Sequence, residues 1–309
     1  MFKTVTVCLE YVSKKLILPD GTMTSRGENM HMNYRVIVAL LVISFFSPVM
    51  ASGEEKPLWE VGVGAAFLQM PDYRGSNESR LYLLPYPYLV YRGDILKVDE
   101  HRISGQIFKT DRVLLDFSGY GAVPVESDDN ASRKDMPDLD PTFELGPALR
   151  IKLWKNEEAK SKMDVSLPVR AFFSTDFSSV RHEGWVFSPR IDFTKDDLIA
   201  GTGLNLGISA GPMFADSGYH DYYYTVEHKY AKAWRPEYSA GGGYSGSTLT
   251  VGLSKQYKQL VFNAFVSADF LQGADFENSP MVKRETTIMS GFNVSWIIFQ
   301  SPETVKAER

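Results

Sequence analysis

The sequence contains a single cysteine, Cys8, and only five histidines among 309 residues. One cysteine cannot form an internal disulfide, which excludes the small disulfide-stapled folds. The metal motifs HExxH and CxxC and the aspartate spacing of calcium loops are also absent. Long hydrophobic runs are missing as well. The longest, 36–50, contains Pro48 and is shorter than the roughly 20 residues that a transmembrane helix needs.

This apolar run is typical of a secretory signal peptide. Arg35 precedes it, and small residues stand before the polar segment that follows. We therefore expect a signal peptide at 32–51 and a mature chain that begins near Ser52. Residues 1–31 would then lie upstream of the true translation start, because a signal peptide begins with its charged end.

The charge of the chain argues against a nucleic-acid-binding protein. The whole chain carries 33 basic and 38 acidic residues, and residues 1–51 hold five of the basic and three of the acidic ones. The mature chain is left with 28 basic and 35 acidic residues, a net charge of −7. Since no basic patch is present, we expect no nucleic-acid partner.

The mature chain alternates apolar and polar residues with a period of two, segment after segment. In one segment Leu167 and Val169 fall on one face and Ser166 on the other. A water-soluble β-sandwich also alternates. Here the polar faces carry glycine, serine, asparagine and full charges over segments of about ten residues, which favours a barrel with lipid outside and water inside. We predict an all-β fold, a transmembrane antiparallel β-barrel of the outer-membrane type at 52–299, with a periplasmic tail at 300–309.

The pattern gives thirteen candidate strands, at 58–69, 81–91, 94–99, 102–108, 112–123, 142–153, 163–173, 183–194, 201–213, 236–246, 248–257, 260–270 and 286–299. A barrel with both chain ends in the periplasm needs an even number. Adding 222–226 gives fourteen strands, and removing one strand from 94–108 gives twelve. We therefore expect about 12 to 14 strands. The long connections, which we expect on the outer side, are 71–80, 124–141, 174–182 and 214–235.

No catalytic, cofactor-binding or metal site is predicted, and we do not expect an enzyme. The histidines of the mature chain are His101, His182, His220 and His228. The nearest approach to a protease pair would set His220 and Asp221 against loop aspartates, but solvated histidines are the simpler reading. The loop aspartates, which could collect a cation but are more simply solvated, are Asp128, Asp129, Asp135, Asp138 and Asp140.

The predicted inner face mixes charges of both signs, at Glu144, Arg150, Lys152, Asp164, Arg170, Arg190, Asp192 and Asp269. A dedicated ion pore would favour one sign at its constriction. Mixed charges on neighbouring strands more readily pair across the lumen, which predicts a narrow or occluded interior.

Ten short sequence motifs follow one another along the mature chain: WEVGVG at 59–64, PDYRGS at 71–76, LPYPY at 84–88, YRGD at 91–94, MPDLDP at 136–141, ELGP at 144–147, LPVR at 167–170, RPEY at 235–238, GGGY at 241–244 and SPMV at 279–282. In this order and spacing the chain resembles the MipA/OmpV family of outer-membrane proteins. The resemblance implies a place in the outer membrane of a Gram-negative bacterium, among lipid and lipopolysaccharide, and no cofactor.

For some members of that family, the resemblance implies a scaffold that links a lytic transglycosylase to a murein synthase, and we expect this role. A porin-like channel, a surface adhesin or an envelope-stress tolerance protein is the alternative. A scaffold should keep its function when the four histidines are replaced together, because imidazole is the likeliest general base of a hydrolytic barrel. A scaffold should instead respond to changes in the turn 155–162 or in the tail.

Overall fold

The computed structural model describes residues 55–93, 96–99, 102–105 and 108–306. The predicted signal peptide, the upstream segment and His101 lie outside the described residues, so the predictions on them stand untested. Within the described part of the chain, no helix has both the length and the apolar character needed to cross a bilayer.

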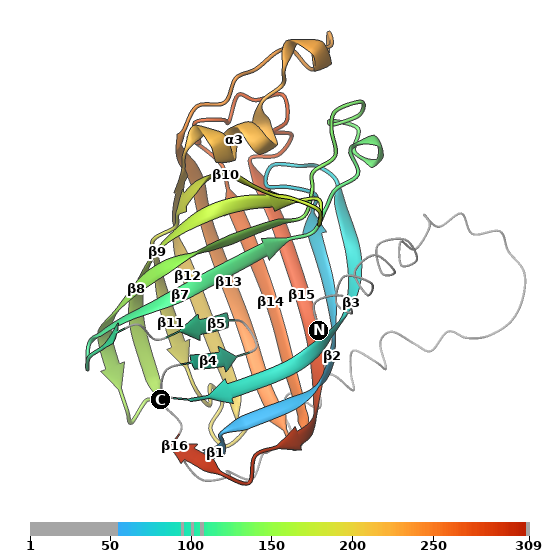
Figure 1. Ribbon diagram of the computed structural model, residues 1–309. Helices are drawn as coiled ribbons and strands as arrows, with labels where there is room; N and C mark the ends of the chain where they lie inside the picture. The colour runs from blue at the N-terminus through green and yellow to red at the C-terminus, as the bar shows by residue number, and fades with distance from the viewer. Residues whose placement is uncertain (1–54, 94–95, 100–101, 106–107, 307–309) are drawn as a thin grey trace, which may run out of the picture.

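Antiparallel strands make up most of the structure (Figure 1). They are β1 (Glu55–Pro57), β2 (Trp59–Pro71), β3 (Ser79–Arg92), β4 (Leu96–Asp99), β5 (Arg102–Gly105), β6 (Phe108–Lys109), β7 (Val113–Ala122), β8 (Thr142–Asn156), β9 (Ser161–Thr175), β10 (Val180–Phe187), β11 (Arg190–Lys195), β12 (Leu204–Ala215), β13 (Gly243–Tyr257), β14 (Leu260–Phe270), β15 (Thr286–Gln300) and β16 (Thr304–Lys306). Among the described residues, one α-helix, α3 (Ser217–Tyr224), and two 3-10 turns, Ser127–Asp129 and His228–Tyr230, lie in the loops.

One fourteen-stranded sheet runs in the order β5-β4-β3-β2-β15-β14-β13-β12-β10-β9-β8-β7-β6, and β11 pairs with both β9 and β12. β10 and β11 therefore occupy a single position in the wall as its two halves. The two ends of the sheet meet, because β5 contacts β7. The sheet thus curls into a barrel whose strands are strongly tilted (Figure 1), which confirms the predicted fold class.

The predicted facing of side chains holds along the wall. On β9, Ser166 and Arg170 are buried inside, whereas Val169 is exposed on the outer face. On β15, Ile288 and Trp296 are exposed outside. Outward apolar and inward polar residues alternate because successive side chains of a strand point to opposite faces of the sheet.

Some of the sequence predictions differ from the structure. Residues 236–246 do not form a strand of their own, because β13 starts only at Gly243 and Tyr238 pairs with Val226 in an isolated bridge. Residues 222–226 are not a strand either, since most of them belong to α3. The helix starts there because the carboxylate of Asp216 accepts a hydrogen bond from the backbone N–H of Tyr219 at 3.1 Å.

The third difference is the connection 174–182, which we expected to be long. β9 continues to Thr175 and β10 begins at Val180, so only a tight turn remains. Oδ1 of Asp176 closes this turn by accepting from the backbone N–H groups of Ser178 and Ser179, at 2.9 and 2.7 Å.

Part of the predicted tail forms a strand, because Thr304–Lys306 pairs with Glu55–Pro57 in a two-stranded ribbon. This ribbon of β1 and β16 lies at the end of the barrel opposite α3 (Figure 1). The long loops gather at the α3 end, as the predicted asymmetry requires.

Candidate functional site

Four loops at the α3 end pack into a cap with a hydrophobic core of its own. The loops are 72–78, 123–141, 216–242 and 271–285. The buried side chains at the centre of this cap are Tyr73, Val125, Leu139, Tyr224, Val226, Ala240, Leu271, Ala274, Phe276 and Met281. The Tyr224 and Phe276 rings stack with centroids 3.6 Å apart. Burial raises the pKa of Tyr73 to about 12, and its hydroxyl donates to the carbonyl of Met281 at 2.9 Å.

A buried arginine ties two of these loops together. Arg235 is wholly buried, and its guanidinium donates to the carbonyls of Ser132, Lys134 and Tyr230 at 2.8, 3.0 and 2.8 Å. A guanidinium presents five donors in a fixed fork, so it can satisfy several carbonyls that would otherwise be buried without partners. The cap is therefore a packed unit and not a set of solvated loops.

The cap is joined to the barrel through His220 of α3. Nδ1 of His220 meets the carbonyl of Gly241, and its Nε2 lies 2.6 Å from Oγ of Ser245 at the start of β13. Because a carbonyl can only accept, Nδ1 carries the proton and Nε2 of the neutral ring accepts from the serine hydroxyl. The contact resembles half of a hydrolase triad, but both side chains are wholly buried. It is best explained as a buried hydrogen bond that fixes α3 to β13.

An ion pair lies directly below this contact. Nε of Arg74 is 3.1 Å from Oδ1 of Asp269, and Nη1 of Arg74 donates to the carbonyl of Ser245 at 2.8 Å. Thr248 donates to the same carboxylate oxygen at 2.6 Å. The mouth of the barrel is thus crossed by a network that connects the loop 72–78 to β13 and β14.

Further ion pairs line the inner wall. Arg170 pairs with Glu144 at 2.7 Å and Arg150 with Asp116 at 3.1 Å, in each case between neighbouring strands. Arg190 pairs with Asp192 at 3.2 Å. These inward charges do pair with one another, but within one strand or between adjacent strands and not across the lumen, as the sequence had suggested, and the narrowness of the interior stays a prediction.

The other described histidines and the loop aspartates make contacts with other side chains. His182 is exposed on β10 and packs edge-on against Trp185, with ring centroids 5.5 Å apart. His228 is exposed at the tip of the cap and meets Glu237 at 2.9 Å. Asp129 pairs with Arg80 at 3.1 Å. Within the described part of the chain, no three His, Cys, Asp or Glu residues are grouped closely enough to share a metal ion.

The ribbon of β1 and β16 is anchored to the opposite end of the barrel. The backbone N–H of Leu58 donates to the carbonyl of Glu303 at 2.9 Å, and that of Ser301 to the carbonyl of Trp59 at 2.8 Å. Arg92 holds the same junction, because it donates to the carbonyl of Pro57 and to Oε2 of Glu60, both at 2.7 Å. Sequence reasoning missed this ribbon because strands of three residues are too short to show a period.

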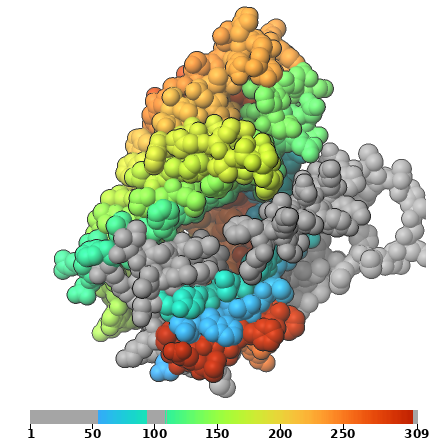
Figure 2. Space-filling view, viewed as in Figure 1, coloured from blue at the N-terminus to red at the C-terminus, as the bar shows by residue number. Residues whose placement is uncertain are grey.

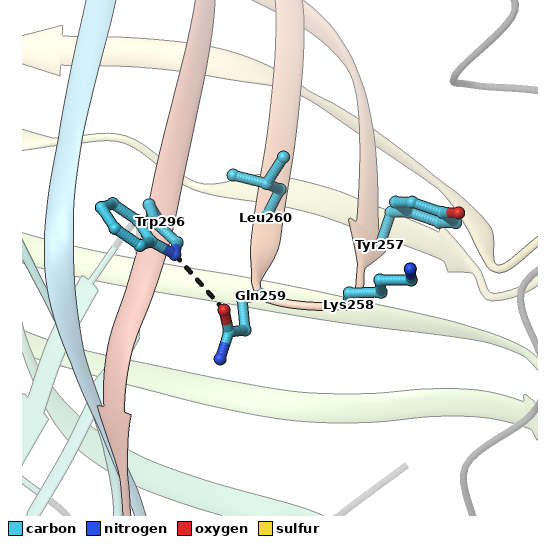
Figure 3. Close-up of a pocket in the computed structure, with 5 residues that line it drawn as sticks. All are labelled: Tyr257, Lys258, Gln259, Leu260 and Trp296. Atoms are coloured by element: carbon cyan, nitrogen blue, oxygen red, sulfur yellow. Dashed lines mark hydrogen bonds between the residues drawn. The ribbon is translucent and has the colours of Figure 1, made fainter.

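A shallow pocket of about 300 Å³ marks the outer rim near the same end (Figure 3). It is lined by Tyr257, Lys258, Gln259, Leu260 and Trp296. The Trp296 indole donates to Oε1 of Gln259 at 3.4 Å. Aromatic rings with a polar edge, such as those of Tyr257 and Trp296, are typical of the boundary between membrane and water.

Solved structures show only distant similarity. A bacterial polysaccharide outer membrane secretin is 10% identical, covers 78% of this chain and 99% of its own, and has a TM-score of 0.39. An active-site mutant of outer membrane phospholipase A from Escherichia coli is 10% identical over 82% of this chain and 96% of its own, with a TM-score of 0.32. Similarity at this level carries no inference about function. No curated protein sequence matches the chain.

The sequence profile described as MltA-interacting protein MipA matches residues 63–298, which span the barrel and its cap. This match confirms the resemblance that the ordered phrases indicated. The chain belongs to the MltA-interacting protein MipA family.

Proposed function

We propose that this protein is an outer-membrane scaffold that holds murein-directed enzymes, a lytic transglycosylase and a murein synthase, at its periplasmic end. The observation that carries the proposal is the anchored ribbon of β1 and β16. A barrel with only tight periplasmic turns offers a partner little surface, and the ribbon adds a protruding one.

The ribbon is suited to bind an extended segment of a partner. Each of its two strands pairs only with the other among the described residues. A strand with an unpaired edge can accept a further strand through main-chain hydrogen bonds. The side chains of Glu55, Lys56 and Glu303 are exposed beside these edges and could select the partner by charge.

The paired charges of the interior favour a scaffold rather than an open channel. Ion pairs at the mouth and along the inner wall hold charges of both signs against each other, as in Arg74–Asp269 and Arg170–Glu144. Such pairs leave no field of one sign that would select an ion.

Truncation after Glu303 tests the proposal. It removes β16 but keeps the backbone bonds of Ser301 and Glu303 that close the barrel end. We expect crosslinking in intact envelopes, followed by purification of the barrel, to recover murein enzymes with the full chain and to lose them with the truncated one. The matched control is Lys229→Ala, an exposed change in the cap.

Equal recovery of the enzymes by both chains, with equal barrel levels in the membrane, would contradict the proposal. Single-channel recordings of the purified barrel complete the test. A large, steady conductance would favour a channel instead, and a phenotype confined to changes in 123–141 would favour surface binding.

A further inference from the structure

The tight turn between β13 and β14 forms one side of the shallow pocket on the outer rim of the barrel (Figure 3). Tyr257, Leu260 and Trp296 are register partners on β13, β14 and β15, so they form one row across three neighbouring strands. All three side chains are exposed, as is Val266 farther along β14. The row therefore belongs to the outer face of the wall and stands at its last level before the turn. Figure 2 shows the molecule from one side with the same colours along the chain.

Lys258 has a backbone conformation that disfavours lysine. Its φ is +55°, in the left-handed region where a Cβ is crowded and glycine is the usual residue. Tyr257 pairs directly with Leu260, so Lys258 and Gln259 are the two central residues of a hairpin turn, and such positions prefer glycine or asparagine when φ is positive. Unfavourable backbone conformations concentrate at functional sites. The lysine thus stands where the turn alone would select a smaller residue.

Among the described residues, the ammonium of Lys258 has no carboxylate partner. It lies over the ring of Tyr257, with Nζ 5.6 Å from the ring centroid. Lys160, in the turn between β8 and β9, offers a direct comparison because its φ is also positive, at +48°. Its Nζ lies 3.2 Å from Oδ2 of Asp197. The charge of Lys160 is therefore already compensated, whereas that of Lys258 is open to an external anion.

Gln259 adds a hydrogen-bond donor beside this charge. The indole N–H of Trp296 donates to Oε1 of Gln259 at 3.4 Å, and because an indole nitrogen can only donate, this contact sets the orientation of the amide. Nε2 of Gln259 points away from the indole (Figure 3). The carbonyl of Gln259 accepts from the backbone N–H of Ile297 at 2.8 Å, which holds the turn against β15. The pocket thus presents an ammonium, an amide NH2 and a phenol hydroxyl, and no carboxylate lines it.

We propose that this pocket binds the head group of an anionic phospholipid, with its phosphodiester against Lys258 and Gln259 and its acyl chains along the outer face of β14. Basic residues at a membrane boundary attract anionic lipid head groups. Hydrogen bonds from an ammonium and an amide suit phosphate oxygens, because the charge strengthens them. Alternation along β14 places Ala264 and Val266 on the same outer face as Leu260, which gives the chains an apolar path.

The lining favours an anionic head group over a zwitterionic one. A zwitterionic head group carries an ammonium of its own, which would meet the like charge of Lys258 and find no carboxylate in the lining. Free phosphate could make the same polar contacts, but only a lipid also covers the exposed side chains of Leu260 and Trp296. The site does not depend on the scaffold role, since it lies on the outer wall and shares no residue with β1 or β16.

Lipid titration of the purified barrel, followed by native mass spectrometry, tests this site. The probes are phosphatidylglycerol, which is anionic, phosphatidylethanolamine, which is zwitterionic, and inorganic phosphate. Lys258→Asn removes the ammonium, and asparagine tolerates the left-handed backbone of the turn. The matched control is Lys160→Asn, which makes the same substitution at the other left-handed lysine. Gln259→Glu is a second pocket variant, because it keeps Lys258 and places a carboxylate beside it.

We expect the unmodified barrel to bind phosphatidylglycerol more tightly than phosphatidylethanolamine. The affinity for phosphatidylglycerol should fall about fivefold in Lys258→Asn, the effect of one lysine near anionic lipid, and should also fall in Gln259→Glu. Lys160→Asn should bind as the unmodified barrel does. An unchanged affinity in either pocket variant, in a barrel that assembles normally, would overturn the proposal.

Two further outcomes would overturn it. An equal fall in Lys258→Asn and Lys160→Asn would show an effect of overall charge and not of this pocket. Displacement of the lipid by an equal concentration of inorganic phosphate would show an anion site that gains nothing from the acyl chains.

Discussion

Nε2 of His220 lies 2.6 Å from Oγ of Ser245, and this one contact joins the helix of the cap to the first residues of β13. Both groups are wholly buried beneath a core to which four loops contribute. One of the contacts that hold the cap to the barrel is therefore made by a titratable side chain, and the stability of the cap should depend on pH.

Burial lowers the pKa of His220 below its ordinary value of 6.5, and the bond to Gly241 and the nearby Asp275 carboxylate offset this only in part. Below pH 6.5 the unfolded cap binds a proton that the folded cap does not. The contribution of His220 is thus present above pH 6.5 and lost as the pH falls through its lower folded pKa. We expect hydrogen exchange of 217–242, corrected for intrinsic rates, to be faster at pH 5 than at pH 7.5.

The control for this prediction is His220→Gln, which keeps an acceptor for Ser245 and does not titrate. Its exchange should differ little between the two pH values. An unchanged pH dependence in the variant would assign the effect to other groups. The same variant also refines the test for an enzyme, since replacing all four histidines by alanine would disturb the cap whatever the function is.

Period-two alternation predicted the barrel because a strand places one face in lipid and the other in water, and each segment carries that pattern by itself. The cap could not be predicted in this way. Tyr222, Tyr224 and Val226 alternate as a strand would, yet the Asp216 cap and the aromatic core make most of the segment helical. The hydroxyl of Tyr73 bonds Met281, and no local spacing shows a contact over that distance in sequence.

Arg235 gives a second prediction. Arg235→Lys keeps the charge but cannot reach the carbonyls of Ser132, Lys134 and Tyr230 together. Each buried carbonyl left without a donor costs about 1–3 kcal/mol. We expect limited proteolysis to cleave the loops 123–141 and 225–238 much faster in this variant than in Lys229→Ala. Cleavage of one loop alone would show that Arg235 does not couple the two.

The ion pair of Arg170 and Glu144 on the inner wall gives a third prediction. Both side chains are nearly buried, so Arg170→Ala leaves a carboxylate without its partner and should lower the free energy of unfolding by about 3–5 kcal/mol. The double variant Arg170→Ala with Glu144→Ala should recover part of that loss, because no lone charge remains. Urea unfolding in detergent measures all three chains. A strictly additive double variant would mean that the pair does not interact energetically.

The last prediction concerns the two faces of β9. Val169 is 42% exposed on the outer face near the middle of the strand. An arginine near the bilayer midplane of a barrel costs roughly 2–4 kcal/mol, so Val169→Arg should reduce assembly into the membrane.

The inner neighbour Ser166 is a poor control, because it pairs in register with Arg150 and Arg190 and an added arginine there would meet like charge. Thr250→Arg is the better one, since Thr250 faces the interior near the middle of β13 and its register partners, Ser209 and Ser267, carry no charge. Heat-modifiable gel mobility of the membrane fraction reports the assembled barrel for each variant. Equal loss in Val169→Arg and Thr250→Arg would remove the assignment of the outer face of β9 to lipid.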